Sequence, residues 1–285
     1  MEIFDAHIHT NFESKWLKKV ASYAGVRFSP EGLQQEMSEN NVAFCTSMGI
    51  KTKDFNIDPL CPTPHDTPGR FKCDKVFYAA GINPYMADRD CFTATREALA
   101  AGRLCALKVY LGYFMLFPDN AAYLQFYELA REFRIPVVFH TGASASTEAS
   151  LNYSHPARIG EIAETYPEVT FIMAHMGKPF LKEAAGVLQS RDNVYADLSG
   201  FIEGPESVYE NDFSFEMQRL GEVVNNRAVP EKLLYGSDWP LTPMKPYIDF
   251  VKRSFPGEEL QRMVFFENAR RLFQGGRRPG FEKTG

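Results

Sequence analysis

The fold and the chemistry of this chain are decided by residues 2–10, EIFDAHIHT, a short apolar stretch that ends in two histidines. Successive side chains of a β-strand point to opposite faces, so Asp5, His7 and His9 are expected on one face. Two imidazoles then converge at the end of one strand, and neutral imidazole is the commonest metal ligand in proteins. Alone, a His-x-His pair is a weak pattern, because it also fits two polar residues where a strand enters a loop.

Seven further short apolar runs follow, and helical patterns separate them. The runs occupy residues 42–48, 76–81, 104–110, 135–142, 169–177, 193–199 and 233–238. The helical patterns occupy residues 30–40, 93–101, 119–133, 156–166, 180–190, 212–225 and 258–273. Eight strands that alternate with helices over the length of one domain predict an α/β fold, a single (β/α)₈ TIM barrel.

The competing architecture is an open doubly wound sheet, which normally carries a glycine-rich phosphate-binding turn after its first strand. His7 and His9 stand in that place here.

We expect one barrel domain over residues 1–274 and a tail rich in Gly, Arg and Lys at residues 275–285. Long βα loops are expected after the first two strands, at residues 11–29 and 50–72, where they would cover the mouth of a site.

The composition is that of a globular protein rather than a membrane or nucleic-acid-binding protein. Hydrophobic residues make up 45% of the chain and charged residues 24%. The absence of any run of about 18 apolar residues argues against a membrane span. The net charge of -5 is mild and the 31 lysines and arginines are spread out, which argues against a nucleic-acid partner. No leader pattern precedes the first strand, so a cytoplasmic location is expected.

The five cysteines are Cys45, Cys61, Cys73, Cys91 and Cys105. They form no close pair, so a disulfide framework is not expected and the thiols are predicted to be reduced. Cys61, His65 and Cys73 lie in one proline-rich stretch, but no fourth ligand follows at a zinc-finger spacing. We therefore interpret that stretch as a loop.

In a (β/α)₈ barrel the active site lies at the C-terminal ends of the strands. The predicted strand ends carry, in order, His7, His9, Lys108, His140, His175 and Asp238. Four of the six histidines fall at these few positions, which chance explains poorly. Imidazole nitrogens and one carboxylate suit a zinc site that keeps an open position. His65 and His155 lie in loops and are expected to be solvated.

The ordered set of motifs resembles the amidohydrolase superfamily almost from end to end. The motifs are FDAHIH at residues 4–9, PVVFHTG at 136–142, FIMAHMG at 171–177, LYGSDWP at 234–240 and ENARRLF at 267–273. More closely, they are similar to the amidohydrolase-related (amidohydrolase 2) branch, which includes aminocarboxymuconate semialdehyde decarboxylase, benzoate-type decarboxylases and lactonases. Each motif alone is unspecific, whereas their order is specific.

This resemblance implies that His7, His9, His140 and Asp238 hold one divalent metal, most often zinc, with His175 beside it. The metal would lower the pKa of its water to about 7. The catalytic residues would be Asp238, which takes the proton of that water, and His175, which polarises or protonates the substrate.

Alternatives to these roles stay open. Asp238 also fits a helix cap, and His175 also fits a core histidine bonded to a carbonyl. Asp5 is expected to support the histidines inside the barrel rather than to bind the metal.

Lys108 has two interpretations. In binuclear members of the superfamily, a lysine at the end of the fourth strand is carbamylated and bridges two metals, so a second metal is one option. That chemistry needs a neutral amine. In a mononuclear member the lysine would stay an ammonium and bind a substrate carboxylate, which fits the branch better.

Further residues at or just past strand ends are expected to contact the substrate. These are Asn83, Tyr110, Tyr113, Thr141, Asp197, Ser199 and Trp239. Aromatic walls with a few polar groups suit a cyclic or unsaturated carboxylic acid.

The sequence therefore predicts a metal-dependent hydrolase that acts on a small organic ester, lactone, amide or carboxylic acid through a metal-activated water. The alternative within the fold is non-oxidative decarboxylation of an unsaturated or aromatic acid, with Arg70 or Lys108 as the cation. The alternative of another class is a catalytically inactive metal-binding barrel. The expected partners are a small-molecule substrate and, optionally, a second copy of the chain in a homodimer.

Overall fold

The computed structural model describes residues 1–49, 73–87, 89–145, 149–205, 214–216, 218–221 and 229–274. Eight parallel strands follow one another around a single sheet in sequence order. They are β1 (Ile3–Ile8), β2 (Val42–Ser47), β3 (Val76–Ile82), β4 (Ala106–Val109), β5 (Val137–His140), β6 (Phe171–Ala174), β7 (Val194–Asp197) and β8 (Leu233–Leu234). The predicted (β/α)₈ barrel is confirmed.

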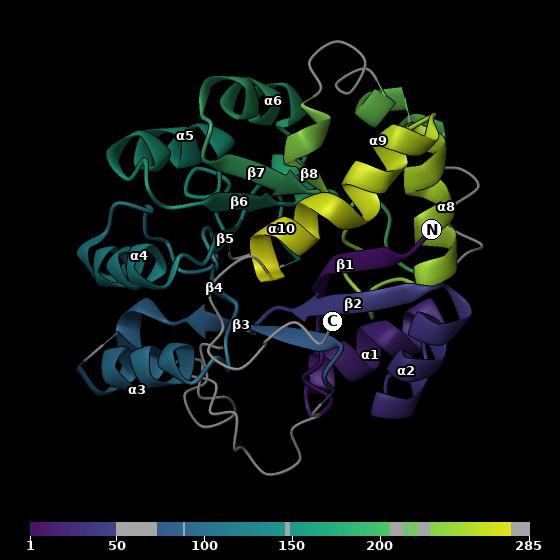
Figure 1. Ribbon diagram of the computed structural model, residues 1–285, viewed down its shortest axis with the longest axis horizontal. Coiled ribbons are helices and arrows are strands. Elements are labelled where there is room, and N and C mark those ends of the chain that lie inside the picture. The colour runs from purple at the N-terminus through teal and green to yellow at the C-terminus, as the bar shows by residue number, and fades with distance from the viewer. Residues whose placement is uncertain are drawn as a thin grey trace, which may run out of the picture.

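Helices cover the outside of the strands (Figure 1). They are α1 (Lys15–Ala24), α2 (Pro30–Glu39), α3 (Arg89–Ala100), α4 (Ala121–Phe133), α5 (Pro156–Thr165), α6 (Leu181–Ser190), α8 (Met244–Ser254), α9 (Glu258–Arg262) and α10 (Asn268–Gln274). Short turns of helix are η1 (Pro84–Met86), η2 (His175–Gly177), η4 (Pro230–Lys232) and the π-helical η5 (Met263–Glu267). Helix α8 was not predicted, and the predicted closing helix is three consecutive pieces, α9, η5 and α10.

Local sequence explains where the helices begin. Ser29 caps α2 by accepting the N–H of Gly32, and Pro30 occupies the first helical position, as expected. Within residues 11–29 the structure places α1, so the prediction of a long loop without a helix is wrong there. Ser14 caps α1 by accepting the N–H of Leu17, and Gly25 ends it in a left-handed conformation.

Several expectations fall on parts of the chain outside the described residues. They are the loop at residues 50–72 with Cys61, His65 and Arg70, and the tail at residues 275–285. Among the other cysteines, Cys45, Cys73 and Cys105 are free, as predicted, but Cys91 is disulfide-bonded. The prediction of reduced thiols is therefore wrong at Cys91.

The barrel has an inner and an outer apolar layer. Phe4, Ala6, Val138 and Ile172 belong to one buried cluster, whereas Ile8 belongs to the layer between strands and helices. The pairing of β1 with β2 is irregular between Asp5 and Ile8. The strict alternation expected for this strand is interrupted there, and His7 rather than Ile8 faces the polar groups at the end of the barrel.

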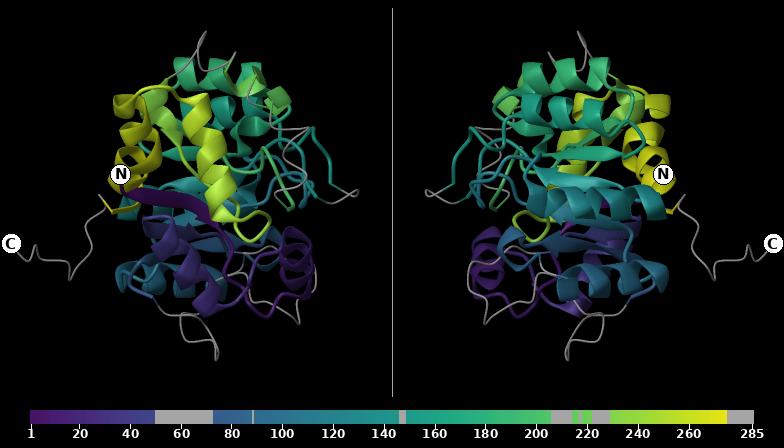
Figure 2. Two further views of the ribbon diagram at one scale, coloured as in Figure 1. Left: turned by 90° about the vertical axis from the view of Figure 1, so that its right-hand side faces the viewer. Right: turned by 90° about the vertical axis from the view of Figure 1, so that its left-hand side faces the viewer.

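The barrel closes through backbone hydrogen bonds between β1 and the segment that follows β8. The N–H of Ala6 donates to the carbonyl of Tyr235 (2.8 Å), and the N–H of His9 donates to the carbonyl of Trp239 (2.7 Å). The first strand also lies beside η5 and α10, so the two ends of the described chain meet (Figure 2).

We expect Asn268→Ala to destabilise the fold without touching the strand ends. Asn268 is buried, and its amide donates to the carbonyls of Pro230 and Leu233, both at 2.8 Å, at the entry to β8. Leaving two carbonyls without these donors should lower the free energy of unfolding by about 1–3 kcal/mol. Urea unfolding followed by circular dichroism measures this, and a wild-type unfolding curve would contradict it.

Candidate metal centre

Three side chains that the sequence predicted as metal ligands converge at the C-terminal end of the barrel. Oδ1 of Asp238 lies 3.1 Å from Nε2 of His9 and 3.5 Å from Nε2 of His7. Within the described residues this Oδ1 has no hydrogen-bond partner, although it is buried. Three potential metal-ligating atoms thus meet within 4.8 Å of one another.

His7 is held in one orientation by Asp197 at the end of β7. Nδ1 of His7 lies 2.8 Å from Oδ2 of Asp197, and both side chains are buried. A carboxylate accepts, so we assign the proton of the His7 ring to Nδ1. Nε2 of His7 then carries a lone pair toward Asp238, which is the state a metal ligand requires.

A chain of polar contacts runs from Asp197 to His140. The Ser199 hydroxyl lies 2.5 Å from Oδ1 of Asp197 and 2.8 Å from Nδ1 of His175. Nε2 of His175 lies 3.1 Å from Nδ1 of His140, and Nε2 of His140 lies 3.0 Å from the carbonyl of Ala143. His140 and His175 are therefore adjacent, but His140 is not part of the group formed by His7, His9 and Asp238.

This chain is one proton short when its members are neutral. The four contacts from Asp197 to the Ala143 carbonyl each need one hydrogen, whereas Ser199, His175 and His140 supply one each. Nε2 of His140 lies 3.0 Å from a carbonyl oxygen, which can only accept, so this nitrogen carries the ring proton and the missing hydrogen belongs to one of the other three contacts. Both ring nitrogens of His140 thus have protein partners in this geometry.

The electrostatic environment favours neutral imidazoles and ionised carboxylates. Burial lowers the pKa of His7, takes that of His140 well below its usual range and brings that of His175 to about 4. Burial opposes ionisation of Asp197 and Asp238, but the neighbouring imidazole of His7 and other donors hold the pKa of both carboxyl groups below the usual range. These are the protonation states in which the groups bind cations.

Lys108 brings a cation to the same end of the barrel. Its side chain is fully buried, and Nζ has no hydrogen-bond partner in the part of the chain that the structure describes. Nζ lies 5.2 Å from the centre of the Tyr110 ring. Burial lowers its pKa to about 8, against the opposing effect of Asp197 and Asp238. Burying an ammonium group without a hydrogen-bond partner is costly, so this position favours an anionic ligand beside Lys108.

Most of the predicted substrate contacts use their polar atoms on the protein. The hydroxyls of Tyr110 and Thr141 donate to the carbonyls of Gly49 and Ala174. The Tyr113 hydroxyl accepts the N–H of Ala145, and the Trp239 indole N–H donates to Glu36. Ser199 contacts His7, His175 and Asp197, as described above.

Asn83 has a polar group, and Tyr113 an aromatic ring, that could contact a substrate. Oδ1 of Asn83 accepts the N–H of Tyr85, while its buried Nδ2 has no partner among the described residues. The Tyr113 ring lies edge-on to the ring of His140, 4.9 Å between centres. These two residues remain candidate substrate contacts.

Asp197 and Ser199 have roles that differ from the predicted ones. Both were predicted as substrate contacts, whereas in the structure Asp197 bonds His7 and Ser199 bonds His175. The signal was available in the sequence, because Asp-x-Ser at the end of a strand puts both side chains on one face, facing the His-x-His of the first strand.

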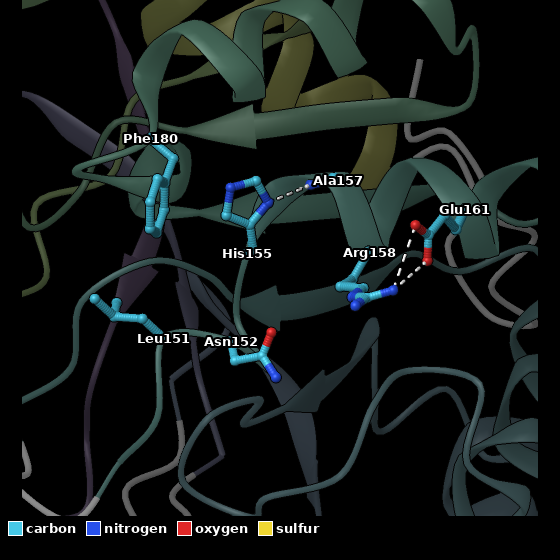
Figure 3. Close-up of a pocket in the computed structure, with 7 residues that line it drawn as sticks. All are labelled: Leu151, Asn152, His155, Ala157, Arg158, Glu161 and Phe180. Carbon is cyan, nitrogen blue, oxygen red and sulfur yellow. Dashed lines mark hydrogen bonds and ion pairs between the residues drawn. The ribbon is translucent and has the colours of Figure 1, made fainter.

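His155 lies apart from the centre, beside a surface pocket of about 300 Å³ (Figure 3). Its Nδ1 accepts the N–H of Ala157 and so caps α5, and its ring packs on Phe180 with 4.4 Å between centres. Arg158 in the same pocket is paired with Glu161. His155 is a helix cap rather than a metal ligand.

Comparison with known protein families identifies the family of this chain. The sequence model of the amidohydrolase family, in its amidohydrolase 2 branch, matches residues 71–275, and the chain belongs to this family. The match begins after the first two strands, so His7 and His9 lie outside it. No match was found among curated proteins.

Solved structures share the barrel at low sequence identity. An uncharacterized TIM-barrel protein from Bordetella bronchiseptica is 16% identical, with a TM-score of 0.70 over 96% of this chain and 99% of that one. A probable 2-pyrone-4,6-dicarboxylic acid hydrolase from Acinetobacter baumannii with citric acid bound is 15% identical, with a TM-score of 0.65 over 96% and 100%. The 2,6-dihydroxybenzoate decarboxylase from Rhizobium is 13% identical, with a TM-score of 0.64 over 96% and 99%.

The chain therefore has the fold of family members that hydrolyse and of members that decarboxylate. Among the helices that the structure describes, none has the length and apolar character needed to cross a membrane.

Asp197→Asn should weaken metal binding while the barrel stays folded. The carboxylate that orients His7 would lose its charge, and removing such a supporting partner typically costs 10–100-fold, so we expect a loss of about that size in metal affinity. Competition with a chelator measures the affinity, with circular dichroism as the check on folding. A folded variant with wild-type affinity would contradict the role assigned to Asp197.

Proposed function

We propose that this protein is a metal-dependent hydrolase of a small, anionic organic ester, lactone or amide. The observation that carries the proposal is the convergence of His7, His9 and Asp238, whose potential ligating atoms all lie within 4.8 Å of one another. A divalent cation bound between them would be a partner for the buried Oδ1 of Asp238 and for both imidazoles.

The residues present fit a divalent cation. His7, His9 and Asp238 would hold it, and His140, which the sequence predicted as a fourth ligand, would have to release the Ala143 carbonyl to join them. Imidazole and carboxylate ligands suit zinc among the common divalent metals, and we propose zinc on that ground. When bound, a divalent cation lowers the pKa of water and polarises a carbonyl oxygen.

The chain's own residues would supply the remaining steps. The Asp238 carboxylate is ionised and accepts the proton of the attacking water, then returns it to the leaving group. The Lys108 ammonium binds a carboxylate of the substrate and fixes its orientation. His175 bonds both Ser199 and His140, so it would have to release one of these partners to polarise or protonate the substrate directly.

Decarboxylation is the second candidate, and the position of Lys108 favours it to a degree. A substrate carboxylate paired with this lysine lies beside the Tyr110 ring and away from bulk water, and such desolvation favours loss of CO₂. The named decarboxylase among the similar structures supports the same option. Product analysis separates the two reactions, because only decarboxylation releases CO₂ from the acid.

We expect one divalent metal per chain in protein purified without chelators or affinity metals. His7→Ala should lose it, because one ligand is gone, while Lys108→Ala should keep it. Metal analysis of the three proteins tests this. Two metals per chain, with loss in Lys108→Ala, would support the carbamate-bridged alternative, and no metal even after reconstitution would contradict the proposal.

Removal of the metal should also lower the melting temperature and abolish turnover of a panel of esters and lactones. A cation that binds only the folded state stabilises it by mass action. Loss of stability in a protein that never turns over any ester, lactone or acid would instead support the inactive metal-binding barrel.

Lys108→Met should selectively impair substrates that carry a carboxylate. Methionine keeps most of the volume but lacks the charge, and a hydrogen bond to a charged group contributes about 1.5–3 kcal/mol, so kcat/KM should fall about 10- to 100-fold. The matched neutral methyl ester of the same substrate serves as control. Equal losses on both substrates would contradict the assignment of a carboxylate to Lys108.

A further inference from the structure

Asp5 is a buried carboxylate outside the group of convergent ligands, yet it is bonded to both segments that carry them. Its Oδ1 accepts the backbone N–H groups of His7 (3.2 Å) and Ser237 (3.0 Å). Its Oδ2 accepts the hydroxyl of Ser237 at 2.6 Å. One side chain of β1 therefore fixes the segment that follows β8.

That segment carries Asp238 in a turn anchored by three successive N–H groups. The N–H of Ser237 donates to Asp5, that of Asp238 donates to the carbonyl of His7 (2.8 Å), and that of Trp239 donates to the Ser237 hydroxyl (3.1 Å). Two of the three anchors thus depend on the pair formed by Asp5 and Ser237.

The backbone of Asp238 needs such anchors. Its φ is 61°, in the left-handed region that residues other than glycine rarely adopt. A residue keeps a conformation of this kind only where the surrounding contacts determine it. At Asp238 those contacts are the hydrogen bonds on either side of it.

We propose that Asp5 and Ser237 are positioning residues of the metal centre, which hold the left-handed turn that aims the Asp238 carboxylate at His7 and His9. The inference rests on the proposed function, because it takes these three residues as ligands. Neither positioning residue would touch metal or substrate. Without them the turn relaxes toward an ordinary φ and carries the carboxylate away from the two imidazoles.

The role is distinct from closure of the barrel. The hydrogen bonds from Ala6 to Tyr235 and from His9 to Trp239 join the same two segments through backbone atoms only. They persist when a side chain at position 5 or 237 changes. Removing the hydrogen bonds between Asp5 and Ser237 should therefore change the positions of the ligand atoms more than it changes the stability of the fold.

The experiment is a titration of the full chain, stripped of metal, with Co²⁺, whose visible absorption reports coordination geometry. Ser237→Ala should fold, raise the Kd for Co²⁺ about 10- to 100-fold and shift or weaken the absorption band, as loss of a supporting partner does elsewhere. Asn268→Ala is the matched control, because it removes buried hydrogen bonds at the other end of β8. It should lose stability and keep the wild-type Kd and spectrum.

The outcomes separate the inference from the proposed function. Wild-type Kd and spectrum in folded Ser237→Ala would overturn the inference and leave the proposed function standing. A wild-type chain that takes up neither Co²⁺ nor Zn²⁺ would overturn the proposed function and the inference with it. An equal loss in Asn268→Ala would show that general stability sets the affinity, which also overturns the inference.

If Ser237→Ala does not fold, Asp5→Asn provides the second test. Asparagine keeps one oxygen for the two N–H donors and loses the acceptor of the Ser237 hydroxyl. A raised Kd with a changed Co²⁺ spectrum supports the inference, and wild-type values overturn it.

Discussion

The hydrogen bonds between residues 5–9 and residues 235–239 are the constraint on which this molecule depends. They join segments up to 232 positions apart in the sequence, and they close the barrel where β8 supplies only two residues of regular strand. Such contacts carry a loop-closure entropy cost, because they join segments that are far apart in the sequence. The same segments carry His7, His9 and Asp238, so closure of the fold also assembles the candidate metal centre.

Three of the five non-glycine residues with positive φ in the described part of the chain lie at this end of the barrel. His175, Met176 and Asp238 all have positive φ, and each such residue costs on the order of 1–3 kcal/mol. Asp197 offsets part of this cost, because its Oδ1 accepts the N–H of His175 (3.0 Å) and that of Ser199 (3.1 Å) while its Oδ2 holds His7. Phe4, Ala6, Val138 and Ile172 belong to a buried apolar cluster, which supports this strained and polar end.

The sequence predicted the architecture because its periodic signal was repeated eight times. It also placed His7, His9 and Asp238 at strand ends that the structure brings together. It could not predict the irregular pairing of β1 with β2 between Asp5 and Ile8, since alternation is the default of any strand. It missed α1 because Ser14 and Gly25 are ordinary loop residues until a packed apolar face gives them the role of caps.

The sequence could not predict the hydrogen-bond partners of individual polar atoms, for a different reason. Whether Ser199 faces a substrate or His175 depends on distances between strands that only the closed barrel defines. The same holds for Trp239, whose indole bonds Glu36 on α2. Residue type and strand position indicate the neighbourhood of a side chain, while tertiary packing decides which atom it bonds.

The position of Lys108 bears on the reactions that the family fold supports here. Strands β4 and β8 are four places apart in an eight-stranded barrel, so Lys108 and the Asp238 turn stand on facing sides of the rim. The buried interior between them is narrow, because Lys108 interacts electrostatically with Asp197 and Asp238 across it. The cation therefore belongs to the same site as the candidate ligands, and it would hold a substrate carboxylate there in either of the two reactions.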